Sequence, residues 1–386
     1  KGIYYDDLLT SCRSGPRVLI NDRKPKKPFT VQATGVEVHR NSGLSNLDIA
    51  SIIENNNVEI LKDISSNSFA KTLLLKSAGK TFVRKNVLKN AGKKHVDVLK
   101  RQKSDLERLN FLHDNLCPKV IGEGENSLEY YYDMEFLEDY RMLSELSETD
   151  KITYLNSTID MMEEHVYCLG KRVDGQVWLD NFLEEKIYSK FENFSLTNEQ
   201  FRVILNRDSV LINGRKYFGI KKCLEMIKKS DILPSKICVV HGDLTLENIM
   251  VDNNGDVKLI DMDGSRLFDA RELDLGKLSQ SIVSRYDLWK NLDGEQISQY
   301  DGNGFKVESR FFEIEKSELL SELFAKWSKV LIDPVDIVRK KSFFYMSMYF
   351  IRFVPFRMNV HINHGVFALI MATVWLNKLI GDKNEN

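Results

Sequence analysis

The sequence predicts an α+β fold with a small antiparallel sheet in its N-terminal part and a mainly helical C-terminal part. Between residues 58 and 137, short apolar runs alternate with polar turns, which is the pattern of a strand meander. From about residue 138 onward, longer segments carry apolar residues at helical spacing. A hairpin pattern between residues 239 and 260 interrupts the helical part and lies next to most of the candidate functional residues.

Three apolar runs define this hairpin region, namely Val239–Val240, Ile249–Val251 and Val257–Ile260. The last two flank Asp252-Asn253-Asn254-Gly255-Asp256, which is strong turn chemistry for a hairpin. A polar loop, residues 241–248, precedes the hairpin, and an acidic loop, residues 261–263, follows it.

The two loops can bring Asp243, Asn248 and Asp261 together at one end of the hairpin. Carboxylate and amide oxygens are ligands that Mg²⁺ accepts, usually together with substrate phosphates. A carboxylate that is not bound to the metal could accept a proton from an attacking hydroxyl. The alternative is a purely structural polar hairpin with an Asp-capped turn.

The order His-Gly-Asp-x-x-x-x-Asn, a strand and Ile-Asp-x-Asp resembles the catalytic core of the aminoglycoside phosphotransferase and choline kinase-like superfamily. The resemblance implies a bilobal protein-kinase-like fold, ATP and Mg²⁺ as cofactors, and transfer of the γ-phosphate to a hydroxyl of a small molecule. It implies that Asp243 is the catalytic base. The implied metal ligands are Asn248 and Asp261, with Asp263 assisting the metal or holding the loop.

Two further residues are expected to support this core. His241 opens the motif, and Asp274-Leu275-Gly276 matches the aspartate that begins a small helix in the resembling families. That aspartate braces the catalytic loop from beneath in those families. A helix N-terminal carboxylate favoured by the helix dipole is the alternative for Asp274, and the two roles are compatible.

Length and composition limit the function classes. The 386 residues suggest two or three units, and a net charge of −1 gives no argument for nucleic acid or a membrane surface as partner. The five cysteines show no C-x-x-C spacing, as in a reduced, cytoplasmic protein. The apolar run Val366–Leu376 is shorter than the roughly 20 residues of a membrane span. We therefore expect a cytoplasmic enzyme without a signal peptide or membrane span.

Residues 1–45 do not fit a kinase. A strand at Arg17–Ile20, the pair Asn21-Asp22 and a second strand resemble the C-terminal end of a haloacid dehalogenase-like phosphatase domain. The resemblance implies that Asp22 was a Mg²⁺ ligand and that a phosphatase-like domain is covalently linked upstream. The chain, which starts without Met, then reads as a fragment of a larger protein. The alternative is an N-terminal extension that packs on the kinase-like lobe.

Residues 46–137 are predicted to form the N-lobe. A short helix at residues 48–55 precedes strands at residues 58–61, 69–76 and 81–87. The resemblance implies that the turn containing Ser66, Asn67 and Ser68 covers the nucleotide phosphates with hydroxyl and backbone N–H groups. This turn has no glycine, and an ordinary polar turn is the alternative.

The strand at residues 81–87 carries the expected phosphate-binding lysine. Strand alternation places Val83 and Lys85 on one face, and the family has an apolar residue two before its lysine, so Lys85 is preferred over Arg84. A helix at residues 94–112 should carry the acidic partner of this lysine. Asp105 is the first choice because it shares the face of Leu109. Gln102 and Glu107 are the alternatives.

A strand from Tyr130 runs into the link between the lobes, where the resemblance implies that Glu135 and Phe136 offer backbone groups to adenine. Residues 138–386 are predicted to form the C-lobe, with an acceptor-shaping insertion at about residues 170–232. Predicted helices cover residues 147–169, 181–194, 310–327 and 336–355, and Asn213-Gly214 predicts a hairpin. Arg352 and Arg357 could reach an anionic acceptor or be solvated.

The predicted acceptor is a sugar or polysaccharide precursor, with choline-type alcohols and aminoglycosides as alternatives. A nucleotide-binding pseudokinase that regulates the phosphatase half is a second class of function. A protein kinase is disfavoured because no Arg precedes Asp243 and no Ala-Pro-Glu-like segment follows.

Overall fold

A computed structural model of the chain describes residues 58–65, 70–126, 128–191, 198–263, 268–284, 298–307, 317–358 and 361–381. The chain separates into two compact units, Lys1–Lys85 and Asn86–Asn386. The expected boundaries at residues 45 and 137 stay predictions. Asp22, the helix at residues 48–55 and the turn of Ser66, Asn67 and Ser68 lie outside the described residues.

The first unit contains strands β1 (Glu59–Asp63), β2 (Lys71–Ser77) and most of β3 (Lys80–Leu88), in the order β1-β2-β3. β1 and β2 are antiparallel, and their register shifts between Ile60 and Lys62. Ala78 and Gly79, with φ of 47° and 78°, form the tight turn into β3. The three predicted strands of this region are therefore confirmed.

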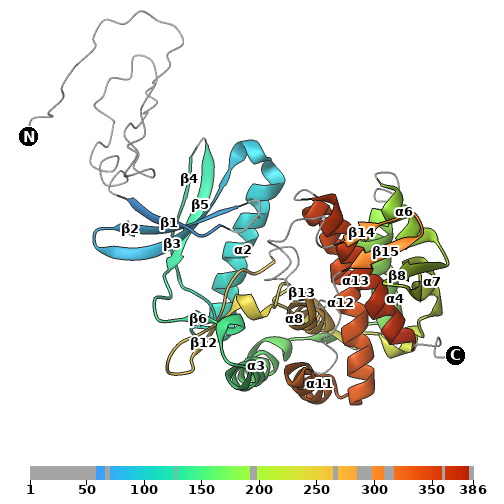
Figure 1. Cartoon of the computed structure of the whole chain (residues 1–386). Coiled ribbons are helices and arrows are strands. Elements are labelled where there is room, and N and C mark those ends of the chain that lie inside the picture. Colours follow the sequence, from blue (N-terminus) through green and yellow to red (C-terminus); the bar gives the residue numbers. More distant parts are fainter. Residues whose placement is uncertain are drawn as a thin grey trace, which may run out of the picture. The chain divides into compact units, whose positions relative to one another are not determined.

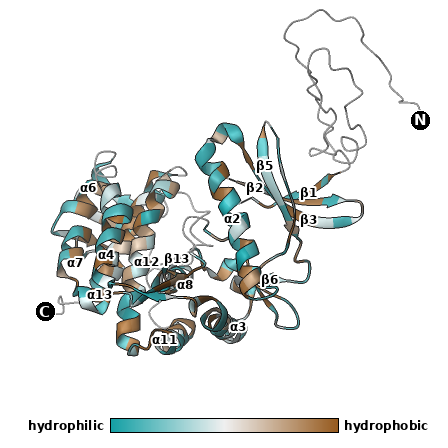
Figure 2. Ribbon diagram, turned by 180° about the vertical axis from the view of Figure 1, so that it is seen from behind, coloured by the Kyte–Doolittle hydropathy of each residue, from teal (hydrophilic) through white to brown (hydrophobic). Residues whose placement is uncertain are grey.

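In the second unit the end of β3 is followed across the sheet by β5 (Glu129–Glu135) and then β4 (Val120–Glu125), which pair antiparallel. After the 3₁₀ turn η1 (Lys89–Ala91), helix α2 (Lys93–Leu112) runs where a helix was predicted. The visible face of α2 is mostly hydrophilic (Figure 2). Its buried residues are Val96, Leu99, Gln102, Leu106 and Leu109.

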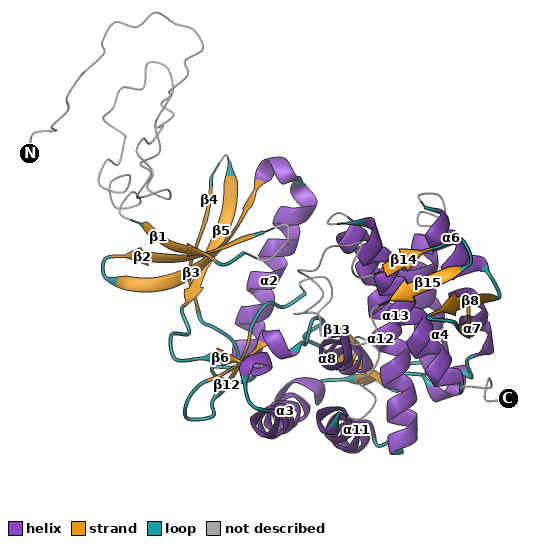
Figure 3. Cartoon of the chain, viewed as in Figure 1, coloured by secondary structure: helices purple, strands orange, loops and turns teal. Residues whose placement is uncertain are grey.

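Helices make up most of the remaining chain (Figures 1 and 3). They are α3 (Glu148–Met162), the π-helical turn η3 (Glu163–Tyr167), α4 (Gly175–Leu183), the π-helical turn η4 (Glu184–Tyr188), α6 (Glu199–Asn206), α7 (Ile220–Met226), α8 (Glu272–Ser284), α11 (Glu318–Leu331), α12 (Val335–Met358) and α13 (Ile362–Ile380). Short 3₁₀ turns are η2 (Leu143–Glu145), η5 (Lys229–Asp231) and η6 (Leu246–Asn248). The architecture is thus α+β, an antiparallel sheet followed by a mainly helical part, as predicted.

The core of the helical part is built around α12, which packs against both α13 and α8. From His364 to Asn377, α13 is fully buried, so the apolar run at residues 366–376 is a core helix. Gly276 of α8 lies against α12 so closely that an added Cβ would meet the Tyr345 Cβ at 2.7 Å. None of the described helices combines the length and apolar character that crossing a membrane requires.

Short strands tie the helices together in three further sheets. The first consists of β13 (Phe268–Ala270), β10 (Lys236–Val239) and β7 (Lys171–Arg172). The second consists of β12 (Val257–Leu259), β11 (Ile249–Val251) and β6 (Arg141–Met142). The third consists of β14 (Ser298–Tyr300), β15 (Gly304–Val307), β8 (Ser209–Ile212) and β9 (Arg215–Phe218). The hairpin β8–β9 turns at Asn213 and Gly214, which both have positive φ, as their sequence predicted.

Two predicted helix starts were wrong. The helix expected at residues 310–327 begins at Glu318 as α11, because the Ser317 hydroxyl caps it by accepting from the Leu320 N–H. The helix expected at residues 181–194 begins at Gly175, because the Asp174 carboxylate caps it by accepting hydrogen bonds from the backbone N–H groups of Gln176 and Val177. The helix predicted from Ser147 starts as expected, with the Ser147 hydroxyl accepting from the Asp150 N–H. Its last turn widens into the π-helical η3.

Candidate active site

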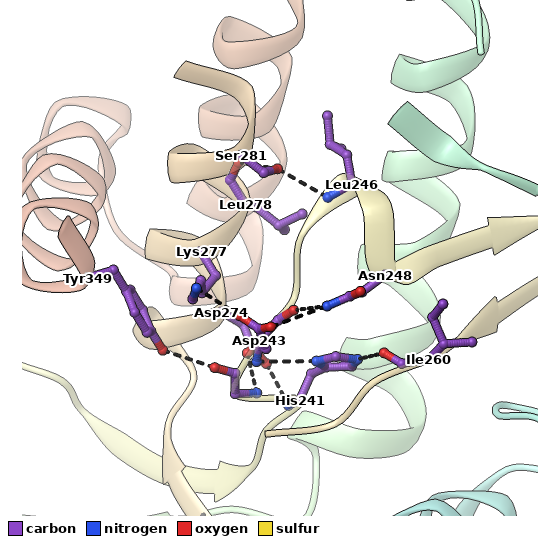
Figure 4. Close-up of polar contacts among 11 residues, drawn as sticks. His241, Asp243, Leu246, Asn248, Ile260, Asp274, Lys277, Leu278, Ser281 and Tyr349 are labelled. Carbon is purple, nitrogen blue, oxygen red and sulfur yellow. Dashed lines mark hydrogen bonds and ion pairs between the residues drawn. The ribbon is translucent and has the colours of Figure 1, made fainter. Parts of the chain in front are cut away.

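The candidate catalytic loop, residues 241–248, connects β10 to β11. Its second half is the 3₁₀ turn η6, in which the Asn248 N–H donates to the Thr245 carbonyl at 3.0 Å. The Leu246 N–H donates to the Ser281 hydroxyl of α8 at 3.1 Å. The loop is therefore tied to α8 and leads directly into the predicted hairpin β11–β12, whose register pairs Ile249 with Leu259 (Figure 4).

Asp274, in the first turn of α8, holds the beginning of the loop. Its carboxylate accepts hydrogen bonds of 2.9 Å from each of three donors: the backbone N–H groups of His241 and Gly242 and the Tyr167 hydroxyl. The side chain is fully buried, and burial raises the pKa of its carboxyl while these donors oppose that rise. The structure thus places Asp274 directly beneath the loop.

Gly242 is required by both backbone and space. Its φ is +80°, in the left-handed region, and a Cβ at this position would meet the Asp263 Cβ at 2.9 Å. The catalytic loop and the acidic loop, residues 261–263, therefore touch at this glycine. The Asp263 N–H also faces the His241 carbonyl, at 3.3 Å.

The buried His241 ring joins the same two loops. Its Nδ1 accepts from the Asp243 N–H at 3.2 Å, and its Nε2 lies 3.0 Å from the Ile260 carbonyl. A carbonyl can only accept, so the proton is on Nε2 and the ring is the neutral Nε2–H tautomer. His241 thereby fixes the backbone on both sides of the site (Figure 4).

Asp243 carries a side chain that is 37% exposed and forms an ion pair of 2.7 Å with Lys277 of α8. Burial raises the pKa of the Asp243 carboxyl, but the Lys277 ammonium outweighs it, with a smaller effect from the Arg352 guanidinium, so the pKa lies below its usual value. Asn248 Nδ2 donates to the Asp243 carbonyl at 2.8 Å and approaches its carboxylate at 3.4 Å.

Lys277 is a site residue that the motif did not identify. Its ammonium lies 4.7 Å from the centre of the Tyr349 ring and 6.0 Å from that of Phe353, both on α12. It comes three residues after Asp274, so both side chains lie on one face of α8. The three-residue spacing between Asp274 and Lys277 is the signal in the sequence, but it indicates a role for Lys277 only when α8 is known to lie beside the catalytic loop.

The acidic loop has a special backbone at Asp261, whose φ is +60°. Aspartate tolerates this left-handed conformation better than most side chains. The N–H of the preceding residue, Ile260, donates to the Asn248 carbonyl at 3.0 Å. This backbone hydrogen bond joins Asn248 to the residue directly before Asp261, so it links two of the predicted metal ligands. Within the described residues the side-chain hydrogen bonds of Asn248 use its Nδ2 group, which leaves its Oδ1 to serve as an oxygen ligand.

No three His, Cys, Asp or Glu side chains of the described residues gather into a metal-binding group. Two carboxylates and one amide oxygen nevertheless fit Mg²⁺, which usually keeps water and substrate phosphates in its remaining positions.

Gln102, an alternative considered for the partner of the lysine, has a different contact. It is buried in α2, and its Nε2 donates to the Met262 carbonyl at 2.7 Å, in the middle of the acidic loop. Its Oε1 is buried and has no hydrogen-bond partner among the described residues. Gln102 therefore anchors the loop that carries Asp261 and Asp263.

Asp105, one turn further along α2, is half-buried, and burial raises the pKa of its carboxyl to about 6. The charge of Asp263 adds to this rise, while Arg108 and Arg101 oppose it. Glu107 lies exposed and pairs with Lys103 at 3.1 Å. The pairing of Asp105 with a nucleotide-binding lysine stays a prediction.

In the first unit, Lys85 is 8% exposed in β3, and the Arg84 guanidinium lies 5.9 Å from the centre of the Phe82 ring. Burial of the Lys85 side chain favours it over Arg84 as a functional side chain, because a solvated cation would remain exposed. Its role stays a prediction.

At the end of β5, the Glu135 carboxylate pairs with Lys258, and the Glu135 N–H donates to the Lys119 carbonyl at 2.9 Å. The N–H of Glu135 is therefore already used. A base bound at Glu135 and Phe136 would have to use the remaining backbone groups of these residues.

A pocket opens beside the catalytic loop. It is lined by Phe182, Lys186, Val240, Gly242, Asp263, Asp269, Leu273, Tyr349 and Arg352. The Tyr349 hydroxyl donates to the Gly242 carbonyl at 3.3 Å, so the pocket wall is joined to the loop. Phe182 and Lys186 belong to the segment 170–232, which was predicted to shape an acceptor pocket.

Comparison with known proteins gives the following. No family model and no curated protein matches the sequence. Among solved structures, a protein from Haemophilus somnus 129PT with a provisional assignment as a fructosamine-3-kinase is 12% identical, with a TM-score of 0.49 over 82% of this chain and 90% of that one. An aminoglycoside-3'-phosphotransferase of type VIII is 14% identical, with a TM-score of 0.43 over 78% of this chain and 97% of that one.

Proposed function

We propose that the chain is an ATP-dependent phosphotransferase that phosphorylates a hydroxyl of a small molecule, with a sugar or polysaccharide precursor as the first candidate acceptor. The observation that supports this most is the junction of the two loops. Asn248 holds Asp243 with its Nδ2, and the backbone of the same Asn248 holds Ile260 directly before Asp261. One hydrogen-bonded unit thus presents a base and three candidate metal ligands.

In the proposed mechanism, Asp243 orients the acceptor hydroxyl and accepts its proton as the oxygen attacks the γ-phosphorus, while the bond from that phosphorus to the β,γ-bridging oxygen breaks and ADP leaves. The low pKa of Asp243 keeps the carboxylate ionised at neutral pH. Asp274 and His241 hold the loop so that little reorganisation is needed when the hydroxyl arrives.

Asn248, Asp261 and Asp263 are the proposed Mg²⁺ ligands. When bound, the metal supplies charge neutralisation at the phosphate oxygens. Lys85, Asp105 and the turn of Ser66, Asn67 and Ser68 are proposed for the nucleotide phosphates, and Glu135 and Phe136 for the adenine. These nucleotide contacts rest on the motif resemblance.

The test is an untargeted transfer assay. The protein is incubated with Mg·ATP and a small-molecule cell extract, and mass spectrometry searches for a species that gains one phosphoryl group. Asp243→Asn should abolish this product, with a loss of at least about a hundredfold in kcat, while Mg·ATP binding stays nearly unchanged. Asp261→Asn should instead weaken Mg·ATP binding.

Asp256→Asn is the matched control, because Asp256 lies exposed in the turn of the same hairpin, away from the loops. It should behave as wild type. Normal turnover by Asp243→Asn would disprove the assignment of the base. Mg·ATP binding without any transfer would favour a nucleotide-binding regulatory module over an enzyme.

A further inference from the structure

The pocket beside the catalytic loop has cations concentrated on one wall. Lys186 of η4 and Arg352 of α12 both line it. Lys190, one turn after Lys186, lies close enough that the charges of Arg352 and Lys186 act on it. We call the pocket-lining Lys186 and Arg352, together with the neighbouring Lys190, the cationic wall; its residues come from η4, the turn after it and α12, which meet only in the folded chain.

Two of these cations form no ion pair with a described carboxylate, although the charge of Arg352 acts on Asp243 from a distance. Arg352 contacts the Tyr349 ring, with its guanidinium 4.9 Å from the ring centre, and forms no hydrogen bond or ion pair with a described side chain. Lys190 likewise has no such partner in the described part of the chain.

Two more deeply buried cations of the same unit are paired. The 4% exposed Arg271 binds Glu163 at 3.0 Å, and the 6% exposed Lys341 binds Glu272 and Asp333 at 3.2 and 2.7 Å. Arg352 and Lys190 differ from these two cations because no carboxylate of the described residues forms an ion pair with either of them.

The wall is also electrostatically unfavourable as it stands. Lys190 is half-buried, and the pKa of its amine is lowered first by burial and then by the charges of Arg352, Lys186 and Lys94. Like charges that are partly withdrawn from water raise the free energy of the folded chain. An anion between them would remove this penalty.

The carboxylates of the pocket serve other purposes. The Asp269 Oδ1 accepts from the Trp178 indole N–H at 3.0 Å and from the Ala270 N–H at 2.9 Å. Asp263 belongs to the loop proposed for the metal.

We infer that this wall binds an oxyanion of the acceptor, so that the substrate is an anionic alcohol carrying a phosphate or carboxylate besides its reactive hydroxyl. The inference rests on the proposed function for the identity of the ligand as acceptor. A chain of contacts places the wall near the base: Arg352 and Lys277 contact the same Tyr349 ring, and Lys277 pairs with Asp243. Choline-like and polycationic acceptors are disfavoured at such a wall.

The test uses inorganic phosphate as a minimal probe. The protein is saturated with Mg²⁺ and a non-hydrolysable ATP analogue, which occupies the nucleotide site, and phosphate binding is measured by calorimetry. Wild type should bind phosphate, and Arg352→Ala and Lys190→Ala should each weaken it by about tenfold, since charge-assisted hydrogen bonds are lost. Arg352→Lys should retain part of the affinity, and Lys222→Ala is the control, because Lys222 lies exposed beside Glu225.

A second arm fractionates the cell extract on an anion-exchange resin before the transfer assay. The acceptor should be in the retained, anionic fraction. An acceptor in the unretained fraction, absence of phosphate binding, or variants that weaken only nucleotide binding would each overturn the inference. Failure of the proposed function is distinguishable, because it would remove transfer from both fractions while phosphate binding by the wall persisted.

Discussion

The ammonium of Lys277 lies 2.7 Å from the carboxylate of Asp243, and the lysine is the more buried of the two, with side-chain exposures of 14% and 37%. Aromatic rings of α12 shield the lysine, which strengthens its field at the carboxylate. The catalytic loop supplies the proposed base, but α8 sets the charge environment in which that base titrates.

Replacement of Lys277 by Met should therefore change the pH dependence of catalysis. Without the ammonium, burial dominates and the pKa of Asp243 rises, so more of the carboxylate is protonated at a given pH. The acid limb of the kcat/KM profile should move to higher pH by about 1–3 pH units. Lys277→Arg keeps the charge and should move it little. Identical acid limbs for wild type and Lys277→Met would show that the pair does not control the base.

Gln102→Leu should loosen the acidic loop. The substitution removes the hydrogen bond to the Met262 carbonyl and leaves that carbonyl unsatisfied. Mg²⁺-dependent ATP binding should weaken by about tenfold while Mg²⁺-free nucleotide binding changes little. Titration of nucleotide affinity against Mg²⁺ concentration measures this. Gln102→Glu, which cannot donate when ionised, should resemble Gln102→Leu, and wild-type affinity in both variants would rule out the anchor.

Asp274→Ala should destabilise the protein as well as inactivate it. Three donors, including two backbone N–H groups of the catalytic loop, would lose their buried acceptor. The free energy of unfolding should fall by about 3 kcal/mol. Tyr167→Phe removes only one of these donors and should cost about 1 kcal/mol. Denaturant unfolding of both variants provides the comparison, and equal losses would mean that the backbone contacts contribute little.

Asp105 should make stability depend on pH. Its pKa is about 6 in the folded state, above the 3.8 of a free aspartate, so the folded state holds the proton more tightly. The contribution of this group to the free energy of unfolding should be greatest below about pH 4, decline between about pH 4 and 6 by up to about 3 kcal/mol, and stay level at higher pH. Asp105→Asn should flatten that decline and be the more stable protein at pH 7.5. A parallel pH dependence in the two proteins would contradict the prediction.

Much of the scaffold could be predicted because its signals are local. The turns at Asn213-Gly214 and residues 252–256 fix their hairpins through backbone conformations that few residues adopt. Helix α2 lies within one residue of its predicted start because its apolar spacing is long and regular. The loops of Asp243 and Asp261 were predicted to converge because they sit at the same end of one hairpin.

The missed features depend on contacts between distant segments. Lys277 lies 34 residues after its partner Asp243 in the sequence. Gln102 lies 160 residues before Met262, whose carbonyl it binds. Neither residue type is distinctive in a helix. The earlier start of α4 was missed because its cap, Asp174, was not recognised as a helix signal.

Gly276 sits between Asp274 and Lys277, where α8 touches α12, and any side chain there would push the two helices apart. α8 carries Asp274, which holds the catalytic loop, and Lys277, which pairs with Asp243, while α12 carries Arg352. The contact between the two helices therefore sets the spacing between the reaction centre and the cationic wall. A Gly276→Ala substitution would therefore increase the distance between the Asp243 carboxylate and Arg352. Gly276 thus determines which spacing between anionic group and hydroxyl a substrate can have, although Gly276 contacts neither of these groups.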